Sequence, residues 1–307
     1  MKRAEFDVII VGAGPAGLTA GIYVARAGLN AVLYEKLSPG GQAATTDLVE
    51  NYPGFDRGIS GLELMEKMES QARRFGLRIE FKPVDRVYSS DGLHFVRTAD
   101  GEDNSARAVI VATGAEPNPL GVPGEDALRG RGVSYCATCD GPLYRSGKVA
   151  VVGGGDSAVG EAIFLTRFAS KVYLVHRRHQ LRATKSLQDK ALSNDKVEFI
   201  WDSVVTRIEG EDSVNSISIR NVRSAKERKL KVDGVFIYVG RKPNSAILDT
   251  EVRSDQKGYI ITNEHMETSV KGLFAAGDVR SKLLYQIATA VGDGATAAYA
   301  VEKSIAG

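Results

Sequence analysis

The stretch VIIVGAGPAGLTA, residues 8–20, joins an apolar run, a glycine-rich turn and the start of a helix. Gly12, Gly14 and Gly17 fit the pattern G-x-G-x-x-G. The first glycine permits a tight turn, the second lets the backbone approach a pyrophosphate, and the third lets the helix pack closely on the strand. The helix N-terminus then offers N–H donors to phosphate groups. We call residues 12–17 the first cradle and predict that it binds a dinucleotide.

The segment NAVLYEK, residues 30–36, favours this interpretation over a purely structural turn. It is typical of a second strand and contains Glu35, about twenty residues after the glycines, where the fingerprint places an acidic residue. A carboxylate there accepts hydrogen bonds from free ribose hydroxyls but repels a 2′-phosphate. The first cradle is therefore expected to take a dinucleotide with an unphosphorylated ribose.

The same pattern returns in VAVVGGGDSAVGE, residues 149–161. Its three pattern positions, which define the second cradle, are Gly153, Gly155 and Ala158. An offset of 141 residues relates Gly12 to Gly153, and the same offset relates Glu35 to His176 without a gap. The chain is therefore predicted to contain two diverged copies of one βαβ unit.

The two copies differ where the ribose is recognised. His176 opens the basic loop HRRHQLR, residues 176–182, which contains Arg177, Arg178 and Arg182. Guanidinium groups bind phosphate through paired N–H donors, so the loop favours a 2′-phosphate and hence NADPH. The alternative is a solvated basic face at a strand end. A chain with two such cradles is most simply a flavoprotein with FAD in the first and NADPH in the second.

Composition and charge agree with a folded protein of about two domains. The 307 residues are 43% hydrophobic and 25% charged, and the net charge is +2. That charge gives no global field that would favour nucleic acid or an acidic membrane. The first apolar run is too short for a signal peptide or a membrane span. We expect a cytoplasmic protein, whose thiols stay reduced unless they do redox work.

The order of the motifs predicts one domain inserted into another. VIVATG, residues 109–114, and GLFAAGDV, residues 272–279, are typical of further buried strands. Asp278 would lie at the carboxyl end of its strand, where ligands bind, or would instead cap the helix that follows. We predict an α/β fold of two Rossmann-like three-layer domains. Their predicted bounds are 1–116 and 245–307 for a discontinuous FAD-binding domain and 117–244 for an NADPH-binding domain.

Two segments between the first cradle and the insertion alternate apolar and polar residues. They are Leu77 to Lys82 and, less cleanly, Leu93 to Thr98. Alternation is typical of strands with one exposed face. We expect them to form a small antiparallel sheet beside the parallel one.

The hexapeptide YCATCD, residues 135–140, holds the only two cysteines of the chain, Cys136 and Cys139. A structural disulfide across two residues would restrict the unfolded chain very little. Zinc needs about four ligands, and the four histidines lack the matching spacing. A pair of inert buried thiols is a further alternative. C-x-x-C lowers one thiol pKa and permits a reversible disulfide, so a redox dithiol is favoured.

The ordered motifs resemble those of the low-molecular-weight thioredoxin reductases of bacteria and archaea. The resemblance covers nearly the whole chain, and CATCD is its most specific part. The motifs are GAGPAG, GGQ (residues 40–42), VENYPGF (residues 49–55), VIVATG, GRGVSYCATCDG, VVGGGDSA, HRRHQLRA, GVFIYVGRKPN and GLFAAGDV. In that family electrons pass from NADPH to FAD, then to the disulfide and to thioredoxin or a thioredoxin-like protein, and the enzyme is a homodimer.

The resemblance also implies residue roles. Cys139 would face the flavin, Cys136 would attack the thioredoxin disulfide, and Asp140 would act as the acid or base beside them. The residues implied for FAD are Gly12, Gly14, Pro15, Ala16, Gly17, Glu35, Lys36, Gly40, Gln42, Thr46, Asn51, Val84, Ala112, Thr113, Gly114, Gly277, Asp278, Gln286 and Ile287. Those implied for NADPH are Gly153, Gly155, Asp156, Ser157, Ala158, His176, Arg177, Arg178 and Arg182. No metal site is expected.

One position departs from the family. Where the family often has Arg-Gln, this chain has Tyr285-Gln286, so a role for arginine does not carry over. Four alternative functions stay open. A peroxiredoxin-reducing relative would carry a second C-x-x-C, a ferredoxin–NADP reductase relative would lack CATC, and a reductase fed by ferredoxin or a deazaflavin would lack the arginines. A redox sensor would hold FAD and the disulfide without turnover.

Overall fold

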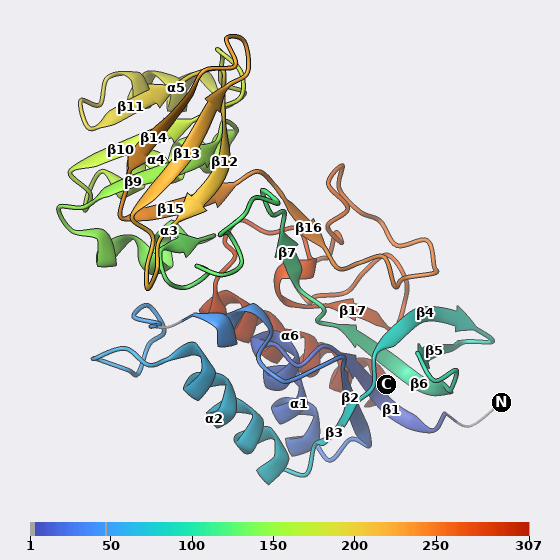
Figure 1. Ribbon diagram of the computed structural model, residues 1–307. Helices are drawn as coiled ribbons and strands as arrows, with labels where there is room; N and C mark the ends of the chain where they lie inside the picture. Colours follow the sequence, from blue (N-terminus) through green and yellow to red (C-terminus); the bar gives the residue numbers. More distant parts are fainter. Residues whose placement is uncertain (1–3, 47, 307) are drawn as a thin grey trace. The chain divides into compact units, whose positions relative to one another are not determined.

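The computed structural model describes residues 4–46 and 48–306 (Figure 1). The chain divides into two compact units. Unit 1 comprises Met1–Glu116 and Lys242–Gly307, and unit 2 comprises Pro117–Arg241. Among the described residues, no helix combines the length and the apolar character needed to cross a bilayer.

Unit 1 is built on a seven-stranded sheet in the order β3-β2-β1-β6-β5-β4, with β17 also paired to β6. Its strands are β1 (Phe6–Val11), β2 (Ala31–Glu35), β3 (Arg78–Phe81), β4 (Val84–Ser90), β5 (Leu93–Thr98), β6 (Asp103–Val111) and β17 (Leu273–Ala275). Strands β3, β2, β1, β6 and β17 run parallel to one another, whereas β5 is antiparallel to β6 and β4 is antiparallel to β5. Both FAD-domain strands expected at residues 109–114 and 272–279 are thus present.

Both faces of the unit 1 sheet are buried, which explains why β1 is an almost continuous apolar run. Val8 and Ile10 pack with the helices, while Ile9 and Val11 pack on the opposite face with Val87 and other apolar side chains. The helical segments of this unit are α1 (Pro15–Arg26), η1 (Gly41–Thr45), α2 (Gly61–Arg74), η3 (Gly277–Val279) and α6 (Ile287–Ala306).

The expectation of a separate antiparallel sheet was wrong. Strand β3 pairs parallel with β2, and β5 joins the antiparallel end of the same large sheet. In β3 only Ile79 is buried, because the strand lies at the sheet edge. Alternation of apolar and polar residues shows which face of a strand is buried. It does not show the direction of the strand, because an edge strand of a parallel sheet gives the same pattern as an antiparallel strand.

Unit 2 contains a parallel five-stranded sheet in the order β11-β10-β9-β15-β8 and an antiparallel three-stranded sheet, β12-β13-β14. Its strands are β8 (Val133–Ser134), β9 (Lys148–Gly153), β10 (Lys171–Val175), β11 (Val197–Ile200), β12 (Ser203–Glu209), β13 (Ser216–Asn221), β14 (Glu227–Lys231) and β15 (Gly234–Tyr238). Its helical segments are α3 (Ala137–Asp140), η2 (Gly141–Tyr144), α4 (Asp156–Leu165) and α5 (Lys185–Leu192).

The parallel sheet of unit 2 lies between two apolar cores. Val149 and Val151 pack with residues of α4, whereas Ala150 and Val152 pack with residues of β12 and β13. Helices, parallel sheet and antiparallel sheet therefore form three layers. The offset of 141 residues relates Pro15, where α1 begins, to Asp156, where α4 begins. The repeated unit predicted from the sequence is thus present in the fold.

The chain passes between the units through two short strands, β7 (Ala115–Pro117) and β16 (Arg241–Pro243), which pair with each other. The sequence places the second domain boundary after Asn244, but this residue is fixed in unit 1. Its N–H donates to Gly114 O (2.9 Å), and its side-chain amide donates to Thr113 O (3.0 Å). These bonds explain why Asn244 belongs with unit 1.

A buried histidine joins three segments of unit 1. His94 in β5 is 4% exposed; its Nδ1 lies 2.9 Å from Ser89 Oγ, and its Nε2 lies 3.1 Å from Lys271 O. A carbonyl only accepts, so Nε2 carries the hydrogen and Nδ1 accepts from the serine hydroxyl. Burial lowers the pKa of His94, and the bond to the Lys271 carbonyl only partly opposes that effect.

We predict that acid destabilises unit 1 through His94. The pKa of this group is lower in the folded than in the unfolded state, so its stabilising contribution is present above the unfolded pKa of about 6.5 and is lost as the pH falls toward the folded pKa. One such group changes the free energy of unfolding by at most about 1.4 kcal/mol per pH unit. Hydrogen exchange of the β5 amides at pH 7.5 and 5.5 measures the change. His94→Gln, which cannot titrate, should show a smaller pH dependence; equal dependence in both proteins would contradict the prediction.

Candidate functional site

The first cradle is formed by backbone atoms in close approach. Gly12 has φ +104°, and a Cβ built on it would lie 2.5 Å from Ala112 O. A Cβ on Gly17 would lie 1.8 Å from Gly12 O, so the helix start can approach the strand only with glycine there. A Cβ on Gly14 would meet nothing within 4 Å. The middle glycine therefore opens on free space, where a phosphate could approach the backbone.

Glu35 is held against this turn. Its carboxylate accepts from Ala13 N (2.8 Å) and from Leu37 N (3.1 Å). The segment before η1 is attached to the same turn, because Gly40 N donates to Ala13 O (2.8 Å). The acidic side chain at the end of β2 is thus oriented by the cradle itself.

The other segments predicted for FAD follow the carboxyl ends of neighbouring strands. Ala112 N donates to Val11 O (2.8 Å), and Ala276 N donates to Val111 O (3.0 Å), so the ends of β1, β6 and β17 lie together. The remaining predicted residues lie at the ends of elements of unit 1. Pro15 and Ala16 begin α1, and Ile287 begins α6. Lys36 follows β2, Thr46 follows η1, and Thr113 and Gly114 follow β6. Val84 begins β4, three residues after Phe81, which is paired with Glu35.

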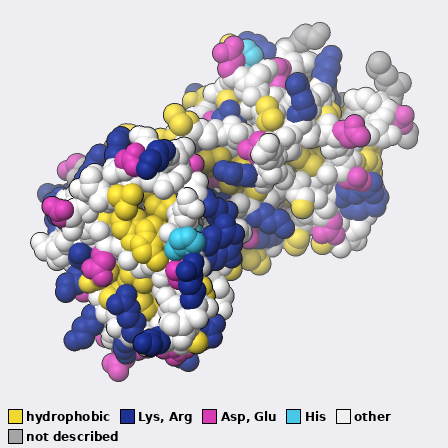
Figure 2. Space-filling view, turned by 90° about the horizontal axis from the view of Figure 1, so that it is seen from above, with side chains coloured by type: hydrophobic (Ala, Val, Ile, Leu, Met, Phe, Trp, Pro, Cys, Tyr) yellow, Lys and Arg dark blue, Asp and Glu magenta, His cyan; other side chains and the backbone are white. Residues whose placement is uncertain are grey.

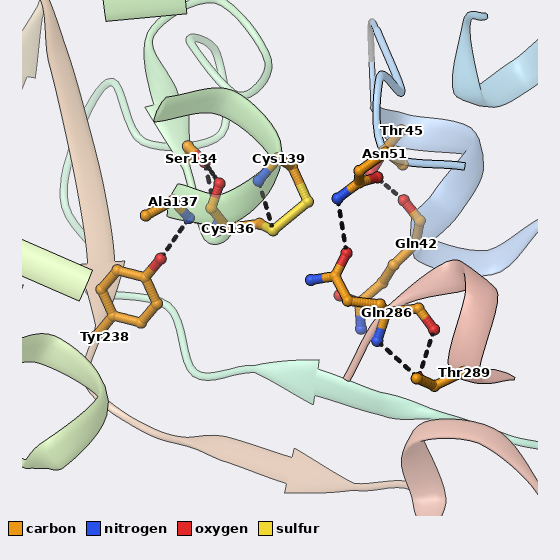
Figure 3. Close-up of a disulfide and its surroundings, with 10 residues drawn as sticks. All are labelled: Gln42, Thr45, Asn51, Ser134, Cys136, Ala137, Cys139, Tyr238, Gln286 and Thr289. Atoms are coloured by element: carbon orange, nitrogen blue, oxygen red, sulfur yellow. Dashed lines mark hydrogen bonds between the residues drawn. A yellow bond between two sulfur atoms is a disulfide. The ribbon is translucent and has the colours of Figure 1, made fainter. Parts of the chain in front are cut away.

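Two predicted flavin-contact residues from distant segments are joined directly. Asn51 Nδ2 donates to Gln286 Oε1 (3.1 Å), although 235 residues separate them in the chain (Figure 3). Gln42, in η1, donates through its amide to Ala115 O. Gln286 N in turn donates to Thr289 Oγ1 (3.2 Å) in the first turn of α6. The loop after strand β2 and the start of α6 are therefore held together in unit 1.

Asp278 does not cap the following helix, because α6 begins at Ile287. It lies in η3, within a group of four charges that the sequence did not predict. Lys282 Nζ lies 3.3 Å from Asp278 Oδ1 and 3.1 Å from Asp293 Oδ2. Asp293 also accepts from Gly277 N (3.1 Å) and from Arg280 Nη1 (3.0 Å). These interactions hold the Gly277–Asp278 turn in place.

The second cradle repeats the open middle position. A Cβ on Gly155 would meet nothing within 4 Å, whereas one on Gly154 would lie 2.3 Å from the His176 ring. The basic loop is fastened to the cradle, since Arg182 N donates to Gly154 O (2.7 Å). Asp156 Oδ1 accepts from Thr184 N (2.7 Å). Ser157 and Ala158 follow Asp156 in the first turn of α4.

His176 lies beneath the second cradle as a neutral side chain. It is 5% exposed, and none of the described residues hydrogen-bonds its Nε2. Burial lowers the pKa of His176; backbone hydrogen bonds to Gln180 and Gly153 partly oppose this, and the charges of Arg182 and Arg178 lower the pKa further. The open turn at Gly155, beside this buried ring, fits a site for a bound nucleotide. Arg177, Arg178 and Arg182 all line one pocket of about 390 Å³.

The two cysteines form a disulfide at the start of α3 (Figure 3). Cys136 Sγ accepts from Cys139 N (3.2 Å), and Cys136 N donates to Ser134 Oγ (3.0 Å). Asp140 ends the helix, and its N–H donates to Cys136 O (3.1 Å). A bond from Cys139 N–H to the sulfur would favour the thiolate of Cys136 after reduction.

Tyr238 is a residue of this centre that the sequence did not single out. Its hydroxyl oxygen accepts from Ala137 N (2.6 Å), a donor in the fully buried residue between the cysteines (Figure 3). Burial raises the pKa of Tyr238, and the charges of Glu161 and Asp140 act in the same direction, so the phenol stays protonated. Its position at the carboxyl end of β15 is the feature that could have indicated it, because ligands bind at the carboxyl ends of parallel strands.

The chain belongs to the pyridine nucleotide-disulphide oxidoreductase family, whose model matches residues 6–294. Membership implies the use of a pyridine nucleotide and a flavin. The resemblance inferred from the motifs and the two-domain Rossmann-like fold are both confirmed.

Several relatives match nearly the full chain. A thioredoxin reductase of Bacillus subtilis is 48% identical over 98% of this chain and 95% of the relative. One of Treponema pallidum is 43% identical over 99% of this chain and 98% of the relative. The crystal structure of thioredoxin reductase from Streptococcus pyogenes is 49% identical, with a TM-score of 0.93 and 98% of both chains covered.

We predict that replacing Arg177 and Arg178 together by alanine weakens the use of NADPH and spares NADH. Two charge-assisted hydrogen bonds are worth about 1.5–3 kcal/mol each, so the preference should fall roughly a hundredfold or more. The ratio of kcat/KM for NADPH to that for NADH measures it. Arg220→Ala, an exposed arginine of β13 in the same unit, is the matched control. An unchanged ratio in the double variant would remove the basic loop from the nucleotide site.

Proposed function

We propose that this chain is an NADPH-dependent thioredoxin reductase. The observation that carries the proposal is the Cys136–Cys139 disulfide in the same compact unit as the second cradle and its basic loop. A disulfide across two intervening residues adds little stability, so its place beside a nucleotide cradle favours a redox role. The full-length relatives carry the name thioredoxin reductase, which supports the choice of substrate.

The two cradles fit the two cofactors. Gly14 and Gly155 both open on free space at a helix start, as pyrophosphate binding requires. In the first cradle Glu35 would receive the free ribose hydroxyls of FAD, and in the second the basic loop would bind the 2′-phosphate of NADPH. When bound, the flavin supplies hydride acceptance and two-electron transfer to the disulfide. The residue sets named for each cofactor in the sequence are proposed to line these two sites.

Reduction of the substrate needs only the two thiols and a proton source. The Cys136 thiolate attacks one sulfur of the substrate disulfide, forming a mixed disulfide and releasing the other sulfur as a thiolate. The Cys139 thiolate then attacks Cys136 Sγ, which restores the Cys136–Cys139 disulfide and releases the second substrate sulfur. The two protons that the Cys136 and Cys139 thiols give up are taken up by the two released substrate thiolates, and Asp140 would relay them. The Ala137–Tyr238 hydrogen bond keeps the two cysteines in one helical turn during this exchange.

Variants of the two cysteines test the proposal. The intact protein should oxidise NADPH when thioredoxin disulfide is present. In Cys136→Ser, NADPH should still reduce the bound flavin while thioredoxin reduction stops, and the remaining Cys139 thiolate should give a long-wavelength charge-transfer band. Cys139→Ser should lack the band.

Steady-state kinetics and absorption spectra of the loaded proteins measure these outcomes. No turnover in the intact protein would favour a redox sensor. Exchanged spectra would mean that the two cysteine roles are reversed.

We also propose that the chain acts as a homodimer formed through unit 1. The packed helices α1 and α6 each expose an aromatic ring, since Tyr23 is 50% and Tyr299 is 58% exposed. Leu284, just before α6, is 52% exposed. Exposed apolar side chains on one unit support an interaction between copies.

Sedimentation equilibrium should give twice the chain mass of 32.9 kDa. The double variant Tyr23→Asp with Tyr299→Asp should dissociate because it would bury charge at the contact. Leu192→Asp, a 58% exposed leucine of unit 2, should stay dimeric. A monomer in the unaltered protein would overturn the proposal.

A further inference from the structure

The pocket beside the basic loop has a fourth arginine that comes from a different segment. Arg223 lies in the turn between β13 and β14, and it lines the same pocket as Arg177, Arg178 and Arg182. Figure 2 shows Lys and Arg side chains gathered beside a histidine on the face seen there. Four guanidinium groups from two segments line one hollow, an arrangement that suits an anion.

The backbone of the turn holds Arg223 in place. Asn221 Oδ1 accepts from Arg223 N (3.0 Å) and from Ser224 N (2.9 Å), which closes the turn at residues 221–224. Val222 N donates to Asp202 O (2.6 Å), and Asp202 N donates to Arg178 O (3.3 Å). Asp202 thus joins the turn to the basic loop through the main chain.

The Asp202 side chain orients the guanidinium. Arg223 Nε lies 3.1 Å from Asp202 Oδ1, and the carboxylate is 15% exposed whereas Arg223 is 62% exposed. The aspartate is therefore the fixed partner, and the arginine reaches outward from it into the pocket. A carboxylate this close to an anion site would repel the anion unless a cation neutralised it.

His179 adds a neutral donor to the same group. Arg223 Nη2 lies 2.6 Å from His179 Nδ1, and a guanidinium only donates, so Nδ1 is the acceptor. The ring hydrogen is then on Nε2. The imidazole N–H and the guanidinium N–H groups that do not contact Asp202 or His179 could then donate to a ligand.

We propose that Arg223, held by Asp202, is a specificity-determining residue that binds the 2′-phosphate of the nucleotide together with the basic loop. This rests on the proposed NADPH site. A 2′-phosphate would receive N–H donors from Arg223 in addition to those from the loop, whereas a ribose hydroxyl gains little from another cation. Removing Arg223 both deletes a phosphate contact and leaves Asp202 as an uncompensated negative charge.

The test uses the intact protein and two small probes, adenosine 2′,5′-bisphosphate and adenosine 5′-monophosphate, with calorimetry as the measurement. Arg223→Ala should raise the Kd of the bisphosphate by about tenfold to a hundredfold, the effect of one charge-assisted hydrogen bond, and leave that of the monophosphate unchanged. Arg228→Ala, an exposed arginine of β14 in the same hairpin, should change neither value. Circular dichroism confirms that the variants fold.

A second variant tests the part assigned to Asp202. Asp202 has φ +49°, a conformation that asparagine tolerates, so Asp202→Asn keeps the turn. Added to Arg223→Ala, it should recover several-fold of the lost bisphosphate affinity by removing the repulsion. If the affinity does not recover, Asp202 does not act on this anion.

The Arg177→Ala, Arg178→Ala variant separates this inference from the function on which it rests. If bisphosphate binding is lost in the double variant but not in Arg223→Ala, the role proposed for Arg223 is overturned and the NADPH site is not. Full bisphosphate binding in both proteins overturns the NADPH site itself, and so does an intact protein that binds neither probe.

Discussion

The structure depends on close backbone approach at the two cradles. In unit 1 the positions of Gly12 and Gly17 leave no room for a Cβ against Ala112 O and Gly12 O. In unit 2 a Cβ on Gly153 would lie 2.5 Å from Tyr238 O. Because helix and strand meet this closely, each helix start lies at the carboxyl ends of its neighbouring strands. The segments that follow those strands are then brought to the same edge of the sheet.

The two cradles share this backbone and differ in the group at the end of the second strand. Glu35 is held by Ala13 N–H, and in the proposed FAD site its carboxylate would receive the ribose diol. At the matching position His176 is buried and neutral, and the charge is moved outward to the arginines of the basic loop. In the proposed function, one folded unit would thus serve two nucleotide preferences through a change of charge at one place. On that proposal the glycines would bind phosphate in both cradles, and the side chains at the ribose would decide the nucleotide.

The features that the sequence predicted depend on short stretches of the chain, whereas the features that it did not predict depend on contacts between distant segments. The glycine spacing, the offset of the repeat and the cysteine pair are each contained in a short stretch, so the fold class, family and redox centre followed from the sequence. The direction of β3 did not, because alternation reports burial only. Asp202 meets Arg223 through a hairpin, and Tyr238 meets Ala137 across 101 residues. No periodicity within either segment indicates such a pair.

The departure at position 285 is best understood through its charged neighbours. Arg280 and Lys282 pair with Asp293, and Lys282 also pairs with Asp278, so these two cations and two carboxylates balance within unit 1. Tyr285 packs its ring on Tyr259 (centroids 5.5 Å apart), and Lys282 Nζ lies 5.7 Å from the Tyr285 ring centroid. An arginine at 285 would place a third cation beside this group, at a cost in repulsion. The tyrosine instead offers its ring face to Lys282, a favourable cation–π contact. The positive charge beside the Asp278 turn is therefore supplied by Lys282, whose side chain is 7% exposed and is held in place by two carboxylates.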